Sequence, residues 1–223
     1  MKQNNILLII SIVNFIRGGK SSIARLIAEM FNTTILNFDT NRNAEHYNVV
    51  NTVNVLDNST VTKKDNKLEI ETDEEIMEIS NPSNFIICDF GGRFDERIGE
   101  FESDLYILPT MDDYESISET IKATKYILKH NPKAKIIHVL NMAMCSNAKE
   151  KEEFRIGYAS NMEMNKITGI TVIEMPKSKL IKNLVNKGLQ SKEIIGNNTS
   201  LKGAYSQINK FTKELINLIE KEI

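Results

Sequence analysis

Short apolar segments alternate along this chain with amphipathic stretches of helical period. Six segments are apolar on successive residues rather than on every second one, which is typical of strands covered on both faces of a parallel sheet. These predicted strands lie at residues 6–13, 34–38, 85–88, 105–108, 135–140 and 170–173. A further strand is expected within 49–55.

Helices are expected between these strands and after the last one. The first occupies 22–31, and the second carries an apolar stripe at positions 117, 121, 124 and 128. A third stripe spans 180–185 and ends at Gly188, and a final helix covers about 204–222. Strands that alternate with helices of this length form βαβ units with right-handed crossovers. The fold class predicted is therefore α/β, a doubly wound, mostly parallel sheet with helices on both faces.

The chain length indicates a single domain. At 223 residues, with no repeat or Pro/Gly-rich linker, residues 1–223 are expected to form one unit. A composition of 41% hydrophobic and 26% charged residues excludes wholesale disorder. The region 41–83 has the weakest pattern: its acidic part, 69–78, is expected to be a solvated face, and 73–79 favours a short helix.

Several classes of protein do not fit this sequence. The apolar segment 6–13 is much shorter than the ~20 residues that cross a bilayer, so we interpret it as a buried strand. Two cysteines, Cys88 and Cys145, are too few for a disulfide scaffold and indicate reduced thiols in a cytoplasmic protein. The three histidines lack a second ligand at metal spacing, so no zinc site is expected.

A glycine-rich turn joins the first predicted strand to the first predicted helix. Backbone N–H groups of such a turn and of the helix N-terminus converge on an anion, and a lysine adds positive charge. The sequence matches the phosphate-loop pattern GxxxxGK[ST] except at its first glycine, which is replaced by an asparagine that tolerates left-handed backbone. A solvated strand–helix turn is the alternative. The residues expected to bind nucleotide phosphates are Asn14, Arg17, Gly18, Gly19, Lys20, Ser21 and Ser22.

Two aspartates, Asp39 and Asp89, come directly after predicted strands. Ligands of open α/β sheets bind at the carboxyl edge of the strands, so both carboxylates can reach one site. A carboxylate beside a phosphate loop binds Mg²⁺ directly or through water. The sequence therefore favours Asp89, with the Ser21 hydroxyl, as the magnesium ligands, although each aspartate could also simply cap a turn.

The order of these motifs resembles that of the ParA/MinD group of P-loop ATPases, over about residues 4–220. The resemblance implies that Lys20 is the phosphate-loop lysine and that Ser21 supplies the magnesium hydroxyl. It also implies that Asp89 is the Walker B aspartate. Gly91 and Gly92 correspond to the switch that senses the γ-phosphate.

The resemblance extends to three further positions. Asp39 matches the second aspartate of a DxD motif, which positions the attacking water. Asn141 matches an asparagine that contacts adenine, and Pro176 begins the loop that lines the base. For the last two, a strand-end turn and a helix N1 proline are the alternatives.

The phosphate loop departs from the family's KGGxGK[ST] pattern. Phe15 stands where the family has the lysine that reaches the partner's nucleotide, and Ile16 and Arg17 replace two glycines. Arg17 could supply the charge in trans, since a guanidinium suits a phosphate contact. Asn37 replaces the first aspartate of DxD. These changes leave nucleotide binding expected and make hydrolysis and nucleotide-locked dimerisation the open questions.

The resemblance implies that the chain binds ATP and Mg²⁺, hydrolyses ATP slowly, and forms an ATP-dependent homodimer. It further implies nonspecific DNA binding, a partner protein that stimulates hydrolysis, and a role in plasmid or chromosome partition. The lysine excess beyond residue 177 is compatible with phosphate contacts. Attachment to a membrane is not expected, because the final helix mixes lysine with glutamate.

Other functions on the same scaffold remain open. A nucleotide-binding adaptor that recruits a partner without turnover is favoured by the altered loop at 15–17. A MinD-like positioning ATPase and a ligase of the dethiobiotin-synthetase kind are further alternatives, although the sequence has no recognisable substrate-carboxylate site for the ligase.

Overall fold

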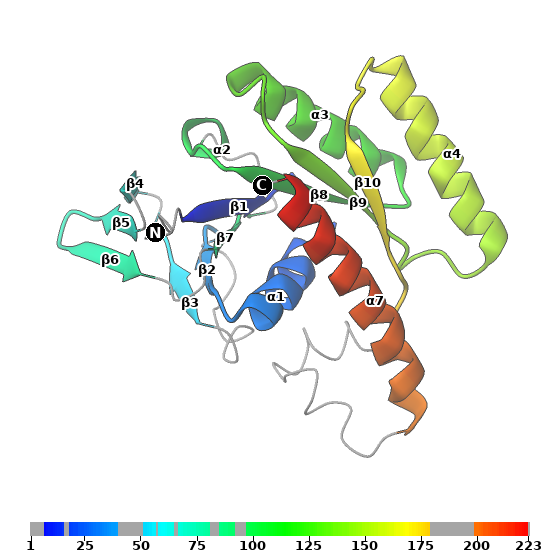
Figure 1. Ribbon diagram of the computed structural model, residues 1–223. Coiled ribbons are helices and arrows are strands. Elements are labelled where there is room, and N and C mark those ends of the chain that lie inside the picture. The colour runs from blue at the N-terminus through cyan, green and yellow to red at the C-terminus, as the bar shows by residue number, and fades with distance from the viewer. Residues whose placement is uncertain are drawn as a thin grey trace.

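A central sheet with helices on both faces forms most of the molecule in the computed structural model (Figure 1). The structure describes residues 7–15, 18–39, 51–56, 58–64, 67–80, 85–91, 97–178 and 199–222. Several sequence predictions fall outside these ranges. They are the helical stripe at 180–185 with Gly188, and the loop and switch residues Ile16, Arg17 and Gly92.

The central sheet has seven strands in the order β10-β9-β8-β1-β7-β2-β3, and every adjacent pair is parallel. All six strands predicted from apolar runs belong to it, and the weaker strand expected at 49–55 is found as its edge strand. The strands are β1 (Leu8–Ile12), β2 (Thr34–Asn37), β3 (Thr52–Asn54), β7 (Phe85–Asp89), β8 (Leu105–Met111), β9 (Ile136–Asn141) and β10 (Thr171–Met175).

Helices cover both faces of this sheet, so the doubly wound α/β class is confirmed. One apolar cluster joins the sheet to α1 (Lys20–Phe31) and α7 (Thr199–Glu222). The opposite face is covered by α2 (Arg97–Glu100), α3 (Tyr114–His130) and α4 (Ala148–Met164). Successive residues of β1 contribute to the two faces, since Ile9 packs in one cluster and Ile10 in the other.

Helix α4 was not predicted from the sequence. Its buried side chains are few and spaced by four residues: Phe154, Tyr158 and Met162. The rest of its surface is polar, so the helix lacks the broad apolar stripe that marks a core-facing helix in a sequence. The narrow stripe is sufficient here because it packs against α3 within one small apolar cluster.

A small antiparallel sheet contains β4 (Thr60–Lys64), β5 (Lys67–Glu71) and β6 (Ile76–Ser80). The helix predicted at 73–79 is therefore wrong, because most of that segment lies in β6. In β5 the buried Leu68 and Ile70 alternate with charged residues, and Ile79 lies opposite Leu68 in the ladder. The period of this region is thus two, and its buried face completes an apolar cluster of the main sheet.

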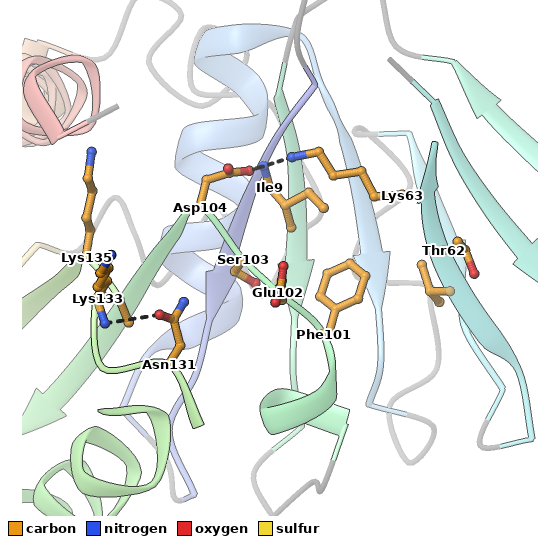
Figure 2. A pocket seen from close by; sticks show the side chains of 12 residues that line it. Ile9, Thr62, Lys63, Phe101, Glu102, Ser103, Asp104, Asn131, Lys133 and Lys135 are labelled. Atoms are coloured by element: carbon orange, nitrogen blue, oxygen red, sulfur yellow. Dashed lines mark hydrogen bonds and ion pairs between the residues drawn. The ribbon is translucent and has the colours of Figure 1, made fainter. Parts of the chain in front are cut away.

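The small sheet is linked to the amino edge of the main sheet. The Lys63 ammonium pairs with the Asp104 carboxylate at 3.1 Å, and the same carboxylate oxygen accepts the Ile9 N–H at 2.8 Å. Beside this link lies a hollow of about 620 Å³ whose wall includes Lys133 and Lys135 (Figure 2). The carboxyl edge, where the predicted site residues lie, is at the other end of the strands. Within the described ranges no helix has the length and apolar character needed to span a membrane.

Candidate nucleotide site

The predicted site residues that the structure describes gather at the carboxyl ends of neighbouring strands. Asp89 ends β7 and pairs in register with Ile12 of β1 on one side and with Asn37 of β2 on the other. Asn141 ends β9. The parallel pairing of these strands, rather than any proximity in sequence, brings the residues to one edge of the sheet.

Gly19 forms the start of α1. It is the N-cap residue, with φ 94° and ψ 21°, a left-handed conformation that favours glycine. A Cβ at this position would also lie 2.7 Å from the side-chain nitrogen of Asn141. Gly19 has no side chain that could cap this helix start, and Lys20 is the first residue of the helix. A helix N-terminus that follows a glycine turn is suited to an anion.

Gly18 lies against the end of β8. A Cβ on Gly18 would be only 2.3 Å from the Pro109 carbonyl oxygen and 2.9 Å from the Asn14 side-chain nitrogen. Since one of these neighbours is backbone, any side chain here would push the loop away from the sheet. The glycine pair is therefore required by close packing at Gly18 and by backbone conformation at Gly19.

Asn14 is completely buried and connects the loop to strand β8 and helix α3. Its side-chain NH₂ donates to the Pro109 carbonyl and to the Thr120 hydroxyl, the latter at 3.2 Å. The expected reason for an asparagine here was tolerance of left-handed backbone. That expectation is wrong, because Asn14 is not among the described residues with positive φ. The residue replaces a glycine because its carboxamide forms a buried bridge.

Asn141 holds the loop from the other side. Its NH₂ group donates to the Gly18 carbonyl at 3.0 Å, and its side-chain oxygen accepts the Ala143 N–H at 3.1 Å. The side chain is 5% exposed. Asn141 therefore contacts the phosphate loop itself. Its adenine contact stays a prediction, as does that of Pro176, which directly follows β10 and is half-buried.

The carboxylate side of the site combines Asp39, Asp89 and Gly91. Asp89 is 2% exposed, and its carbonyl accepts the Phe38 N–H at 3.0 Å, which joins the ends of β7 and β2. A Cβ on Gly91 would lie 3.3 Å from the Asp39 carboxyl carbon. The residue predicted to position water thus lies directly against the first residue of the predicted switch.

Lys20, Ser21 and Ser22 lie in the first turn of α1. Lys20 is buried, with 8% of its surface exposed, whereas the two serines are half-buried. A buried ammonium requires compensating groups nearby, and it is suited to an anionic ligand at the helix start. The roles of Lys20 as a phosphate-loop lysine and of Ser21 as a magnesium hydroxyl stay predictions.

Phe15 occupies the position where the resemblance has a lysine. The side chain is partly buried and packs against the apolar cluster that contains Phe38 and Phe90. An aromatic residue packed on its own chain cannot provide the charge that the family's lysine supplies. The described part of the loop thus keeps the glycines, the lysine and the serine of the phosphate-loop pattern and lacks a charged residue at position 15.

The donor set fits a triphosphate with Mg²⁺. The buried Asp89 carboxylate and the Ser21 hydroxyl are hard oxygen donors, and Mg²⁺ is typically held by one or two such groups together with substrate phosphates and water. The glycine turn provides a cradle with no Cβ atoms. Among the described residues no cluster of three or more His, Cys, Asp or Glu side chains is arranged to hold a metal ion.

Comparison with known structures identifies the same fold. A plasmid partition protein from Borrelia burgdorferi B31 bound to AMPPNP is 16% identical, with a TM-score of 0.55 over 97% of this chain and 99% of that one. The MinC:MinD cell division complex of Aquifex aeolicus is 12% identical, with a TM-score of 0.56 over 94% and 96%. A ParA family ATPase from Chlorobium tepidum TLS is 14% identical, with a TM-score of 0.57 over 94% and 98%.

These similarities define the class of fold to which the chain belongs. It has the fold of the ParA/MinD-type P-loop ATPases along nearly its whole length, so the resemblance inferred from the motifs is confirmed at that level. No protein-family model matches the chain. No curated protein matches it either.

Proposed function

We propose that this protein is a ParA-like ATPase that binds ATP with Mg²⁺ and hydrolyses it slowly. The observation that carries the proposal is the loop between β1 and α1. There a left-handed Gly19 precedes the helix start, a buried Lys20 opens the helix, and carboxamides on both sides hold the turn against the sheet. The structural neighbour bound to AMPPNP, an ATP analogue, supports nucleotide binding by this fold.

Each residue of the proposed site has a distinct part. The loop N–H groups and the Lys20 ammonium would bind the β- and γ-phosphates and neutralise their charge. Ser21 and Asp89 would hold Mg²⁺, which when bound supplies further positive charge to the phosphates. The Asp39 carboxylate, beside the predicted switch at Gly91, would orient the water that attacks the γ-phosphorus. Hydrolysis on this arrangement depends on positioning and electrostatics.

The proposed biological role is partition of plasmid or chromosomal DNA by an ATP-dependent homodimer. Support comes from the partition protein and the ParA family ATPase among the structural neighbours. Nonspecific DNA binding and a partner that stimulates hydrolysis belong to this proposal. A MinD-like positioning role is compatible with the same fold, since the MinC:MinD complex is also a neighbour.

A second candidate function is an adaptor that binds nucleotide without turnover. Phe15 favours it, because this residue packs into the protein's own apolar cluster where the resemblance has a charged lysine. Such an adaptor would use nucleotide binding to recruit a partner protein. Steady-state ATPase measurements with and without DNA distinguish the two functions, since only the ATPase consumes ATP.

Titration of Mg·ATP into wild type, Lys20→Ala and Lys135→Ala tests the proposal. Lys135 is an exposed control at the opposite edge of the sheet. Loss of a charge-assisted contact should weaken nucleotide binding by about 10- to 100-fold in Lys20→Ala and leave Lys135→Ala unchanged. Equal affinity in all three proteins would overturn the phosphate-loop assignment. Sedimentation of the same samples reports whether ATP induces a dimer.

A further inference from the structure

Asn37 ends β2, two residues before Asp39, and its side chain is enclosed by the protein. Only 2% of the residue is exposed. Its side-chain oxygen accepts the Asp39 N–H at 3.1 Å, and its NH₂ group lies 3.3 Å from the Asp39 carbonyl oxygen as a second, longer hydrogen bond. One carboxamide thus engages both main-chain polar groups of Asp39.

The same NH₂ group also donates to the side-chain oxygen of Asn54 at 2.9 Å. Asn54 ends β3 and pairs in register with Asn37. The carboxamide of Asn37 therefore links the turn at Asp39 to the neighbouring edge strand. A carboxylate at position 37 could accept the Asp39 N–H but could not donate to either oxygen, because an ionised carboxylate is an acceptor only.

The turn held in this way determines where the Asp39 carboxylate lies. The Cα, Cβ and carboxyl carbon of Asp39 are 3.5, 3.4 and 3.3 Å from the position of a Cβ on Gly91. The whole side chain therefore lies along the first residue of the predicted switch. A small rotation of the turn would move the carboxylate away from that segment, and misplacement by about 1 Å can cost about 100-fold in rate.

We propose that Asn37 is a positioning residue for ATP hydrolysis, which fixes the Asp39 carboxylate toward the attacking water. The proposal rests on the proposed ATPase function. Asn37 acts through its two hydrogen bonds to the main chain of Asp39. It replaces the aspartate that the resemblance has at this position, so in this chain a neutral side chain that both donates and accepts holds the turn.

Five variants test the proposal: Asn37→Ala, Asn37→Asp, Asn54→Ala, Asp39→Asn and the double variant Asn37→Ala/Asp39→Asn. Asn37→Ala removes all three contacts, whereas Asn54→Ala removes only the outer one and serves as the matched control. We expect kcat to fall about 10- to 100-fold in Asn37→Ala, with KM for ATP changed by less than about threefold. Asn54→Ala should retain kcat within about threefold of wild type.

The double variant separates positioning from a general structural role. If Asn37 acts through Asp39, adding Asn37→Ala to Asp39→Asn should lower kcat no further. Asn37→Asp keeps the oxygen that accepts the Asp39 N–H, so its kcat should recover to well above that of Asn37→Ala. Thermal unfolding of each variant confirms that it is folded before kinetics are compared.

The two proposals fail in distinguishable ways. Wild type without ATP turnover would overturn the proposed function and this inference with it. Wild-type turnover with an unchanged kcat in Asn37→Ala would overturn the positioning role alone. An equal loss of kcat from Asn37→Ala in the wild-type and Asp39→Asn backgrounds would also overturn it, because the residue would then not act through Asp39.

Discussion

Replacing Gly18 by alanine should disrupt the phosphate loop with a single added methyl group. The new Cβ would lie 2.3 Å from the Pro109 carbonyl oxygen and 2.9 Å from the side-chain nitrogen of Asn14. Carbon and oxygen atoms that are not bonded normally approach to roughly 3.3 Å or more, so one partner has to move by about 1 Å. Pro109 lies within a central strand, so the loop is the part that moves.

The displacement has two measurable costs. Overpacking of a close-packed site lowers the free energy of unfolding by about 1–3 kcal/mol. A shift of about 1 Å also stretches the 3.0 Å hydrogen bond from Asn141 to the Gly18 carbonyl, so the loop loses its preformed shape. We expect the affinity for Mg·ATP to fall by at least about tenfold, because the free energy of binding then has to reorder the loop.

Gly157→Ala is the matched control. Gly157 lies inside α4, and a Cβ there would meet no atom within 4 Å. An alanine in a helix interior is favoured over glycine by about 0.5–1 kcal/mol, so this variant should be slightly more stable and bind nucleotide as wild type does. Chemical denaturation measures the stability of both variants, and calorimetric titration measures binding. The reasoning is refuted if Gly18→Ala matches wild type in both measurements.

Two further predictions concern residues away from the loop. His138 is hydrogen-bonded to the hydroxyl groups of Thr124 at 2.8 Å and Tyr158 at 2.6 Å, and burial lowers its pKa to about 3. Below about pH 6.5 the unfolded chain binds a proton at His138 that the folded chain does not bind. The free energy of unfolding therefore falls by up to about 1.4 kcal/mol per pH unit as the pH drops towards 3. Denaturation at pH 7.5 and 5.5 should show a smaller loss of stability for His138→Gln than for wild type, and equal losses would count against this prediction. Asp104→Ala removes the acceptor of a β1 main-chain N–H as well as an ion pair, so it should cost about 1–3 kcal/mol of stability in a urea titration. Lys63→Ala removes only the partly exposed ion pair and should cost less than about 1 kcal/mol, and the reverse order would contradict the assignment.

The main sheet could be predicted from the sequence because its strands are covered on both faces. Burial on both faces favours apolar residues at successive positions of a strand, so the runs at 85–88 and 105–108 stand out without any knowledge of their partners. The small sheet could not be recognised in the same way, because one face of β5 carries charge and only two of its residues are buried. The segment 73–79 was therefore mistaken for a helix, whereas the solvated face expected for the acidic part is confirmed, because residues 73–78 are exposed.

In the candidate site, too, the sequence predicts the local motif but not the contacts with residues that are distant in the sequence. Gly18, Gly19 and Lys20 form a local motif, and the sequence identifies them correctly as a strand–helix turn. The contacts that hold this turn could not be predicted, because Asn14 bonds to a carbonyl 95 residues away and Asn141 to one 123 residues away. The only available signal was that asparagines follow or end predicted strands, and this pattern does not reveal which groups they bond.

The departures from the phosphate-loop and DxD patterns have a common physical character. Asn14 stands where the loop pattern has glycine and Asn37 where the resemblance has aspartate, yet both are buried and both use their amides to hold main chain. Asn141 does the same at the end of β9. A carboxamide carries no charge, so it can fix a loop from within the protein without the desolvation cost of a buried ion and without competing with phosphate for Lys20. Under the proposed function, the chain separates two tasks: neutral amides determine the shape of the site, and the charged residues Lys20, Asp39 and Asp89 interact with nucleotide, metal and water.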